Sequence, residues 1–227
     1  LGVVDHVGAQ VALVELHTLH DVDVDAEGVG ILDGDDAVLA DLLHGVGDLL
    51  EYIGRITDGE VDSLVKEYFE LYTVPDRSGA AMASIREAAR QELGIRAFLE
   101  TGGYSGFTTT FEDLHGLRQL PGLAAQRLMA DGYGYAAEGD ATAAMLMAAM
   151  LRLCGQAGFS EMYMMDFARE AILLCHAGEG NWAMCRRDKK PFLMDRVFNE
   201  GGLSNPPTPI FTPEPGPAGV MSLVHVG

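Results

Sequence analysis

The stretch GFTTTFEDLHGLRQLPGLAAQRLMADGYGYAAEGD, residues 106–140, decides the fold class of this chain. Its β-branched and aromatic start, residues 106–111, predicts a strand that ends at a loop. Pro121 marks the first turn of a helix. The Gly-Tyr-Gly-Tyr run at residues 132–135 leads into another strand, and Ala141–Leu153 predicts a long helix after it. Strands and helices that alternate in this way predict an α/β layer with a largely parallel sheet.

The segment before this stretch is predicted to be mainly helical. Thr57–Glu60 resembles a helix start, because acidic side chains are favoured in the first turn. The residues that follow place one apolar face at helical spacing: Val61, Leu64, Val65, Tyr68, Phe69 and Tyr72. A second helix is predicted from Ala80 to Leu93, where good helix formers dominate. Ile95–Leu99 is predicted as a separate short element.

Downstream, the pattern changes near residue 188. Phe159–Phe167 is short and ambiguous, whereas the apolar run Ala171–Cys175 predicts a buried strand. From Lys189 onward, seven prolines separate short β-type runs, of which Val220–Val226 is the last. We therefore predict an all-β unit that begins after this point.

The predicted organisation has three parts. Residues 52–188 form a Rossmann-like α/β domain with a parallel sheet, and residues 189–227 form the beginning of a C-terminal all-β domain that is incomplete in this chain. Residues 1–51 are an acidic segment of unclear origin. The first fifty residues hold 11 of the chain's 34 acidic residues and no Lys or Arg, so the rest carries 23 acids and 15 bases, a charge of −8.

Two interpretations of the acidic segment stay open. It is either an ordinary acidic α/β segment, with a strand at Val11–Leu16 and a helix at Ala37–Leu50, or a wrong-frame translation fused to a real domain. Its restricted alphabet and the missing initiator Met motivate the second hypothesis.

Composition excludes several classes of partner. A net charge of −19 argues against nucleic acid and against an anionic membrane surface, since both require clustered Lys and Arg. No apolar run reaches the roughly 18 to 20 residues that a membrane span needs, and no signal peptide is visible. The three cysteines, Cys154, Cys175 and Cys185, are predicted to be reduced thiols in or near the core. A reducing cytoplasm is the simplest compartment.

Three polar side chains lie at or near predicted strand ends: Glu138, Glu161 and His176. Because ligands bind beyond the carboxyl ends of parallel strands, these groups are expected to converge there. Two carboxylates and an imidazole suit a divalent cation such as Mn²⁺. Taken singly, each glutamate has a plainer interpretation as a surface or capping residue, and His176 as a hydrogen-bonded structural histidine.

A competing interpretation concerns the glycines of residues 132–137. Gly-Tyr-Gly-Tyr-Ala-Ala has the spacing of a dinucleotide-binding fingerprint, which must follow a strand and open a helix. The residues before it are predicted to be helical, so this interpretation is disfavoured.

The sequence also resembles a known family. FLETGGYSGFTTTFEDLHGLRQLPGLAAQRLM, residues 98–129, and GYGYAAEGD, residues 132–140, resemble the L-arabinose isomerase family closely and without gaps. Weaker similarity extends upstream to residue 56 and downstream through residue 223. The resemblance implies the central α/β domain of that family and the start of its C-terminal β domain.

The resemblance also implies an activity. In that family two glutamates and two histidines hold Mn²⁺, and Glu138, Glu161 and His176 match three of these positions. Phe111 matches an aromatic residue of the sugar pocket. The implied reaction converts L-arabinose to L-ribulose, or a similar aldose to its ketose, with Glu138 and Glu161 as candidate acid/base residues. The implied partner is a small sugar, and full-length relatives are homo-oligomers.

Some positions depart from the family pattern. The fourth ligand, a histidine, falls beyond residue 227, and His225 lies in a different motif. Glu200 stands where the family has an apolar residue. We therefore expect little activity from the isolated chain. The alternative is a non-catalytic fragment or remnant that keeps the fold and weak metal binding.

Overall fold

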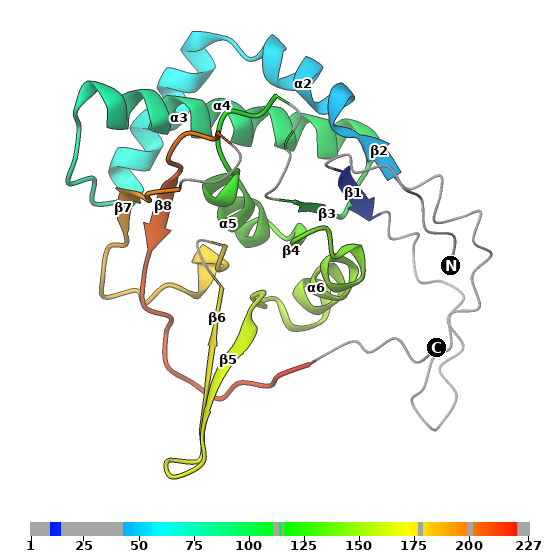
Figure 1. The fold of residues 1–227 in the computed structure, drawn as a ribbon, viewed down its shortest axis with the longest axis vertical. Coiled ribbons are helices and arrows are strands. Elements are labelled where there is room, and N and C mark those ends of the chain that lie inside the picture. Colours follow the sequence, from blue (N-terminus) through cyan, green and yellow to red (C-terminus); the bar gives the residue numbers. More distant parts are fainter. Residues whose placement is uncertain are drawn as a thin grey trace.

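A computed structural model describes most of the chain, which contains both helices and strands and alternates between them over residues 106–154 (Figure 1). The described residues are 10–14, 43–110, 114, 116–176, 179–198 and 202–221, with side chains from residue 49 onward. The mixed helix and strand content confirms the predicted α/β class. No helix in these parts of the chain combines the length and the apolar character that a membrane span requires.

The main sheet has four strands in the order β2-β1-β3-β4. They are β2 (Leu43–Gly45), β1 (Gln10–Val14), β3 (Gly106–Thr109) and β4 (Gly134–Ala137). Only β3 and β4 run parallel; β1 is antiparallel to both of its neighbours. The expectation of a largely parallel sheet therefore holds for the β3–β4 pair alone, and the Rossmann-like topology stays a prediction.

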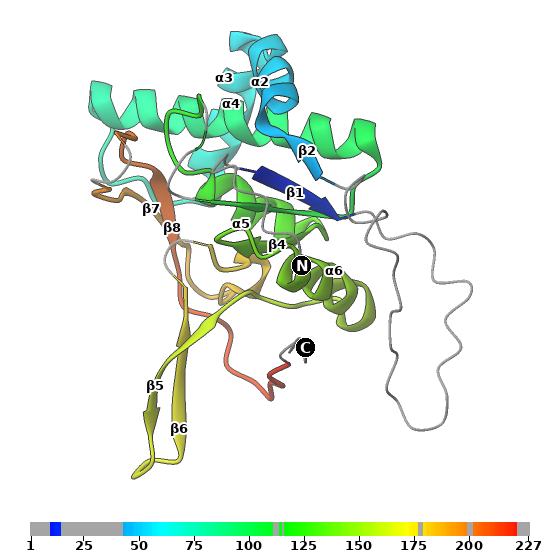
Figure 2. The ribbon, with the colours of Figure 1, turned by 45° about the vertical axis from the view of Figure 1, so that its right-hand side comes forward.

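The described part of the chain forms five α-helices. They are α2 (Val46–Arg55), α3 (Asp58–Leu71), α4 (Gly79–Gly102), α5 (Gly122–Ala130) and α6 (Ala141–Cys154). In Figure 2, β1 and β3 lie between α4 on one side and α6 on the other. The core between these layers includes the fully buried rings of Phe107 and Tyr135, whose centroids are 4.9 Å apart. Two such layers bury one hydrophobic core, as α/β packing requires.

The predicted start of α3 is confirmed in detail. The Thr57 side chain accepts from the Glu60 N–H, and the Glu60 carboxylate accepts from the Thr57 N–H at 2.8 Å, which is a complete capping box. The predicted apolar face is also largely confirmed, with these side chains buried: Val61, Leu64, Val65, Tyr68 and Tyr72. Tyr72 lies just past the helix end, as its C-cap.

Helix α4 is longer than predicted. It runs without a break to Gly102, so Ile95–Leu99 is its last part and not a separate element. Ile95, Phe98 and Leu99 follow one another at helical spacing and are all buried in the core, which favours continuation of the helix. The helix ends at Gly103, whose φ of +68° is the left-handed cap that glycine adopts readily.

One buried ionic cluster joins three helices. The Glu92 carboxylate of α4 accepts from Arg127 Nε of α5 at 2.9 and 2.8 Å and from the Tyr68 hydroxyl of α3 at 2.7 Å. Glu92 is 1% exposed and Tyr68 is fully buried. Each charge is therefore compensated where solvent cannot reach it, as a buried ion pair requires.

The remaining strands form antiparallel pairs. β5 (Glu161–Asp166) and β6 (Ala171–Cys175) make a hairpin, and β7 (Phe192–Asp195) pairs with β8 (Pro207–Ile210). The hairpin projects from the body of the molecule in both views (Figures 1 and 2). An all-β second domain stays a prediction, and most of the predicted strand at Val220–Val226 lies outside the described residues.

Two burial predictions were wrong. Ala171–Cys175 is a strand, but every residue of β6 is exposed, because the hairpin stands clear of the core. The three cysteines are free, as predicted, yet Cys154 and Cys175 are exposed. Cys154 ends α6 and Cys175 ends β6, so both lie at the margin of the packed layers.

We predict that Glu92→Gln lowers the free energy of unfolding by about 3 kcal/mol, because the buried Arg127 guanidinium keeps only the half-exposed Glu67 as a charged partner. Chemical denaturation followed by circular dichroism measures this loss. Glu100→Gln, an exposed position on the same helix, is the matched control and should change stability by less than about 0.5 kcal/mol. Equal effects for the two variants would contradict a stabilising role for the cluster.

We also predict a loss of stability in alkali. Burial raises the pKa of Tyr68 well above its usual range and also raises that of Tyr72. The folded state therefore keeps both phenols protonated, and stability falls as the pH rises through about 10, where unfolded tyrosines ionise. Unfolding curves at increasing pH test this, and Tyr72→Phe should lose less stability over the same range. A native state that ionises both phenols without unfolding would refute the prediction.

Candidate functional site

Glu138 lies where β4 turns into α6. It directly follows the strand and has a φ of +60°, and Gly139 after it has a φ of +79°. A positive φ is uncommon for a residue other than glycine, and such residues concentrate at functional sites. Asp140 then caps α6 by accepting from the Ala143 N–H at 2.8 Å. The Glu-Gly-Asp motif is thus a tight strand-to-helix turn with the Glu138 side chain exposed.

Two glycines let the layers approach closely enough to form this turn. A Cβ at Gly134 would lie 2.3 Å from the Ala144 carbonyl oxygen and 2.5 Å from Ala148 N, both on α6. A Cβ at Gly106 would lie 2.6 Å from the Gly134 carbonyl oxygen of the neighbouring strand. Only glycine fits at such a close backbone approach.

The same geometry contradicts the dinucleotide interpretation of residues 132–137. In that fingerprint the glycines follow a strand and open a helix. Here Gly134–Ala137 is itself strand β4, and Gly134 serves the contact between β4 and α6. Helix α6 begins only at Ala141, after the whole strand, and the Asp140 side chain caps its first turn.

Glu161 and His176 come together through the hairpin. Glu161 is the first residue of β5 and pairs with Cys175, so His176 follows directly at the same end of the hairpin. The predicted reason for their proximity was wrong, because β5 and β6 are antiparallel and not members of a parallel sheet. Glu161 is exposed, whereas 10% of the His176 side chain is exposed.

The His176 imidazole has two close neighbours. Its ring packs edge-on against Phe159, with centroids 5.0 Å apart. Its Nδ1 lies 2.7 Å from Glu179 Oε2, as an ion-pair contact and not an aligned hydrogen bond. Contact with the Glu179 carboxylate raises the pKa of His176; burial opposes this, and the charges of Glu161 and Glu138 add to it. Both predicted glutamates therefore lie within electrostatic reach of the imidazole.

Glu179 was missed by the sequence analysis. It is 7% exposed, and its second oxygen, Oε1, accepts from the Tyr135 hydroxyl at 2.9 Å. The Tyr135 oxygen also lies 2.9 Å from Thr109 Oγ1. Because Tyr135 donates its proton to Glu179, Thr109 donates to Tyr135. Burial raises the pKa of Tyr135 well above its usual range, so the phenol keeps the proton that it donates.

The donor chemistry suits a divalent cation, although the side chains are not gathered around one point. Two carboxylates and an imidazole are ligands that Mn²⁺ accepts. With Nδ1 against Glu179, Nε2 is the nitrogen that can bind a metal, an arrangement common among metal-binding histidines. Among the described residues, no three His, Cys, Asp or Glu side chains converge closely enough to hold an ion. Phe111 lies outside the described residues.

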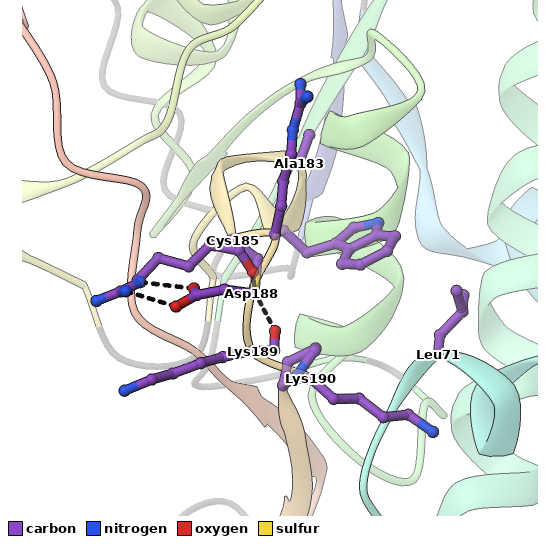
Figure 3. A pocket seen from close by; sticks show the side chains of 10 residues that line it. Leu71, Ala183, Cys185, Asp188, Lys189 and Lys190 are labelled. Atoms are coloured by element: carbon purple, nitrogen blue, oxygen red, sulfur yellow. Dashed lines mark hydrogen bonds and ion pairs between the residues drawn. The ribbon is translucent and has the colours of Figure 1, made fainter.

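A hollow elsewhere on the protein is lined by none of the candidate site residues. It has a volume of about 440 Å³ and is lined by these residues among others: Trp182, Cys185, Arg186, Arg187, Lys189 and Lys190 (Figure 3). Its basic lining would favour an anion. Arg186 is already paired with Asp188 at 2.9 and 2.7 Å, and Lys190 donates to the Phe69 carbonyl oxygen. Because these two side chains already have partners, the hollow is less suited to bind an anion.

Comparison with known proteins places these residues in a family. The model of the L-arabinose isomerase central domain matches residues 40–156, and the model of the L-arabinose isomerase C-terminal domain matches residues 156–227. The first match begins inside the acidic segment, which argues against a foreign reading frame for residues 40–50. The division predicted at residue 188 stays a prediction.

Individual relatives agree with the family models. L-arabinose isomerase from Escherichia coli O7:K1 is 41% identical over 216 residues, and that from Salmonella enteritidis is 41% identical over 218 residues. Each alignment covers 88% of this chain and 43% of the relative, so the chain spans less than half the length of these relatives. The resemblance of the sequence is thereby confirmed: the chain belongs to the L-arabinose isomerase family.

Proposed function

We propose that this chain is part of an aldose–ketose isomerase that converts L-arabinose to L-ribulose, with one Mn²⁺ held by Glu138, Glu161 and His176. The observation that carries the proposal is the position of Glu161 and His176 at one end of the hairpin, where the charges of Glu161 and Glu138 act on the imidazole. The strained turn after β4 presents Glu138, and one end of the hairpin presents the other two. The relatives named L-arabinose isomerase support the choice of reaction.

The residue types suit the chemistry. Isomerisation moves a proton between two adjacent carbons through an enediol, so a carboxylate is needed to take the proton and return it. Glu138 and Glu161 are both exposed and so accessible to a sugar. The cation, when bound, supplies positive charge that stabilises the negative charge developing on the sugar oxygens. The Phe159 ring and the buried Glu179 carboxylate hold His176 in position while a glutamate takes the proton from one sugar carbon and returns it to the next.

The other proposed properties follow from this function. The substrate is a small uncharged sugar, the location is the cytoplasm, and the whole protein is a homo-oligomer. Phe111 contributes an aromatic surface to the sugar pocket.

A second candidate function is a non-catalytic remnant that keeps the fold and weak metal binding. Among the described residues, no three possible ligand side chains surround one point, and this finding favours the remnant. The two candidates differ in a measurable way. An isomerase binds Mn²⁺ and turns over L-arabinose with it, whereas a remnant shows weak binding and no turnover. Robust Mn²⁺-dependent turnover by the 227-residue chain alone would contradict the inactivity we expect of it.

We predict that Glu138→Gly in the whole protein separates the site from the fold. Glycine relieves the positive φ, so the free energy of unfolding should stay unchanged or rise by up to about 1 kcal/mol. Loss of the carboxylate should lower Mn²⁺ affinity and isomerase activity at least about tenfold. Calorimetric titration with Mn²⁺ and a ketose assay measure these losses.

The matched control is Glu170→Gly, because Glu170 has a φ of +52° in the hairpin turn. It offers the same backbone relief outside the proposed site and should leave Mn²⁺ affinity unchanged. A Glu138→Gly variant that binds Mn²⁺ as the natural protein does would refute the assignment of Glu138.

A further inference from the structure

We propose that Glu179 is a positioning residue, whose carboxylate is held by Tyr135 and fixes His176 so that its Nε2 faces the cation. This inference rests on the proposed function for the identity of the cation.

Both carboxylate oxygens of Glu179 are engaged. Oε1 accepts from the Tyr135 hydroxyl at 2.9 Å, and Oε2 lies 2.7 Å from His176 Nδ1. The residue is 7% exposed, so its charge is largely removed from water. A buried carboxylate is costly unless its oxygens have partners. Tyr135 satisfies Oε1 with a hydrogen bond, and the imidazole beside Oε2 is the group that this second oxygen can orient.

Tyr135 is a rigid anchor for this carboxylate. It is fully buried in the middle of β4, and its ring packs against Phe107 of β3. Its hydroxyl receives a hydrogen bond from Thr109, also on β3, which leaves its own proton for Glu179. Both hydrogen bonds therefore run in one direction: Thr109 on β3 donates to Tyr135 on β4, and Tyr135 donates to Glu179.

The same strand carries a proposed ligand. Tyr135 precedes Glu138 by three residues, and Glu138 directly follows β4. The hairpin that carries His176 is thereby tied to the strand that presents Glu138. A shift of β4 would therefore move Tyr135, which holds Glu179, together with Glu138.

The chemical consequence concerns the imidazole tautomer. A carboxylate beside Nδ1 favours the form that carries its proton on Nδ1, and the lone pair then lies on Nε2. A metal-binding histidine needs that lone pair, and the orienting partner typically changes metal affinity by about 10- to 100-fold. Glu179 would supply this orientation without touching metal or sugar.

The test uses the whole protein that contains this chain, with two variants and one control. Glu179→Gln keeps the shape and removes the charge. Tyr135→Phe keeps the packed ring and removes the hydroxyl that holds Glu179. Glu214→Gln changes an exposed carboxylate outside the cluster and is the matched control. Circular dichroism first establishes that all three variants fold.

Two readouts follow. Nitrogen NMR of the metal-free protein, at a pH where His176 is neutral, reports which ring nitrogen carries the proton. Calorimetric titration with Mn²⁺ reports affinity. We expect Glu179→Gln to shift the proton from Nδ1 toward Nε2 and to weaken Mn²⁺ binding by about 10- to 100-fold. Tyr135→Phe should give smaller changes of the same kind, and Glu214→Gln should give none.

Unchanged ring-nitrogen shifts and unchanged affinity in Glu179→Gln would overturn the inference. The NMR readout needs no metal, so it separates the two proposals. If the natural protein does not bind Mn²⁺, the proposed function fails, while the tautomer still shows whether Glu179 positions His176. If Mn²⁺ binds and Glu179→Gln changes neither readout, the proposed function stands and the role of Glu179 does not.

Discussion

The contact on which the proposed site depends is that of the Glu179 carboxylate, which lies between Tyr135 and His176. Tyr135 belongs to the region matched by the central-domain model, and Glu179 and His176 belong to the region matched by the C-terminal model. The contact therefore crosses from one matched region to the other. Separating the two regions would remove the Tyr135 hydroxyl from the buried Glu179 carboxylate, although His176 would stay beside it. The hydrogen bond from Tyr135 to Glu179 therefore links the segment after the hairpin to strand β4.

A second constraint is the close backbone approach around β4. Gly106 and Gly134 have no room for a side chain, so β3, β4 and α6 lie closer together than other residues would permit. The chain then leaves β4 through Glu138 with a positive φ. Tight packing on one side and a strained turn on the other fix the direction in which this carboxylate points. Local strain is tolerated because the surrounding contacts determine the path of the chain.

Local patterns in the sequence predicted much of this structure, and tertiary contacts explain where they did not. The helix start at Thr57–Glu60 and the strands and helices of residues 106–154 were predicted because each follows from neighbouring residues. The antiparallel direction of β1 and the exposure of β6 depend on how distant segments pack, which periodicity does not encode. Glu138, Glu161 and His176 stand out through motifs. Glu179 does not, because it lies outside any helix or strand and its partner Tyr135 is distant in sequence.

Two buried carboxylates among the described residues, Glu92 and Glu179, invite comparison, and Glu179 is the one that contacts a proposed metal ligand. Glu92 is surrounded by Arg127 and Tyr68, both of which end inside the helical core, and the arginine stays charged at any physiological pH. That cluster is complete in itself and stabilises the packing of three helices. Glu179 also has a tyrosine donor, but its other partner is an imidazole, which has a second nitrogen able to bind a metal. The neighbours of that imidazole include the exposed Glu138 and Glu161. Glu179 therefore differs from Glu92 in its partner: the imidazole of His176 keeps a nitrogen that can bind a metal, whereas the Arg127 guanidinium does not.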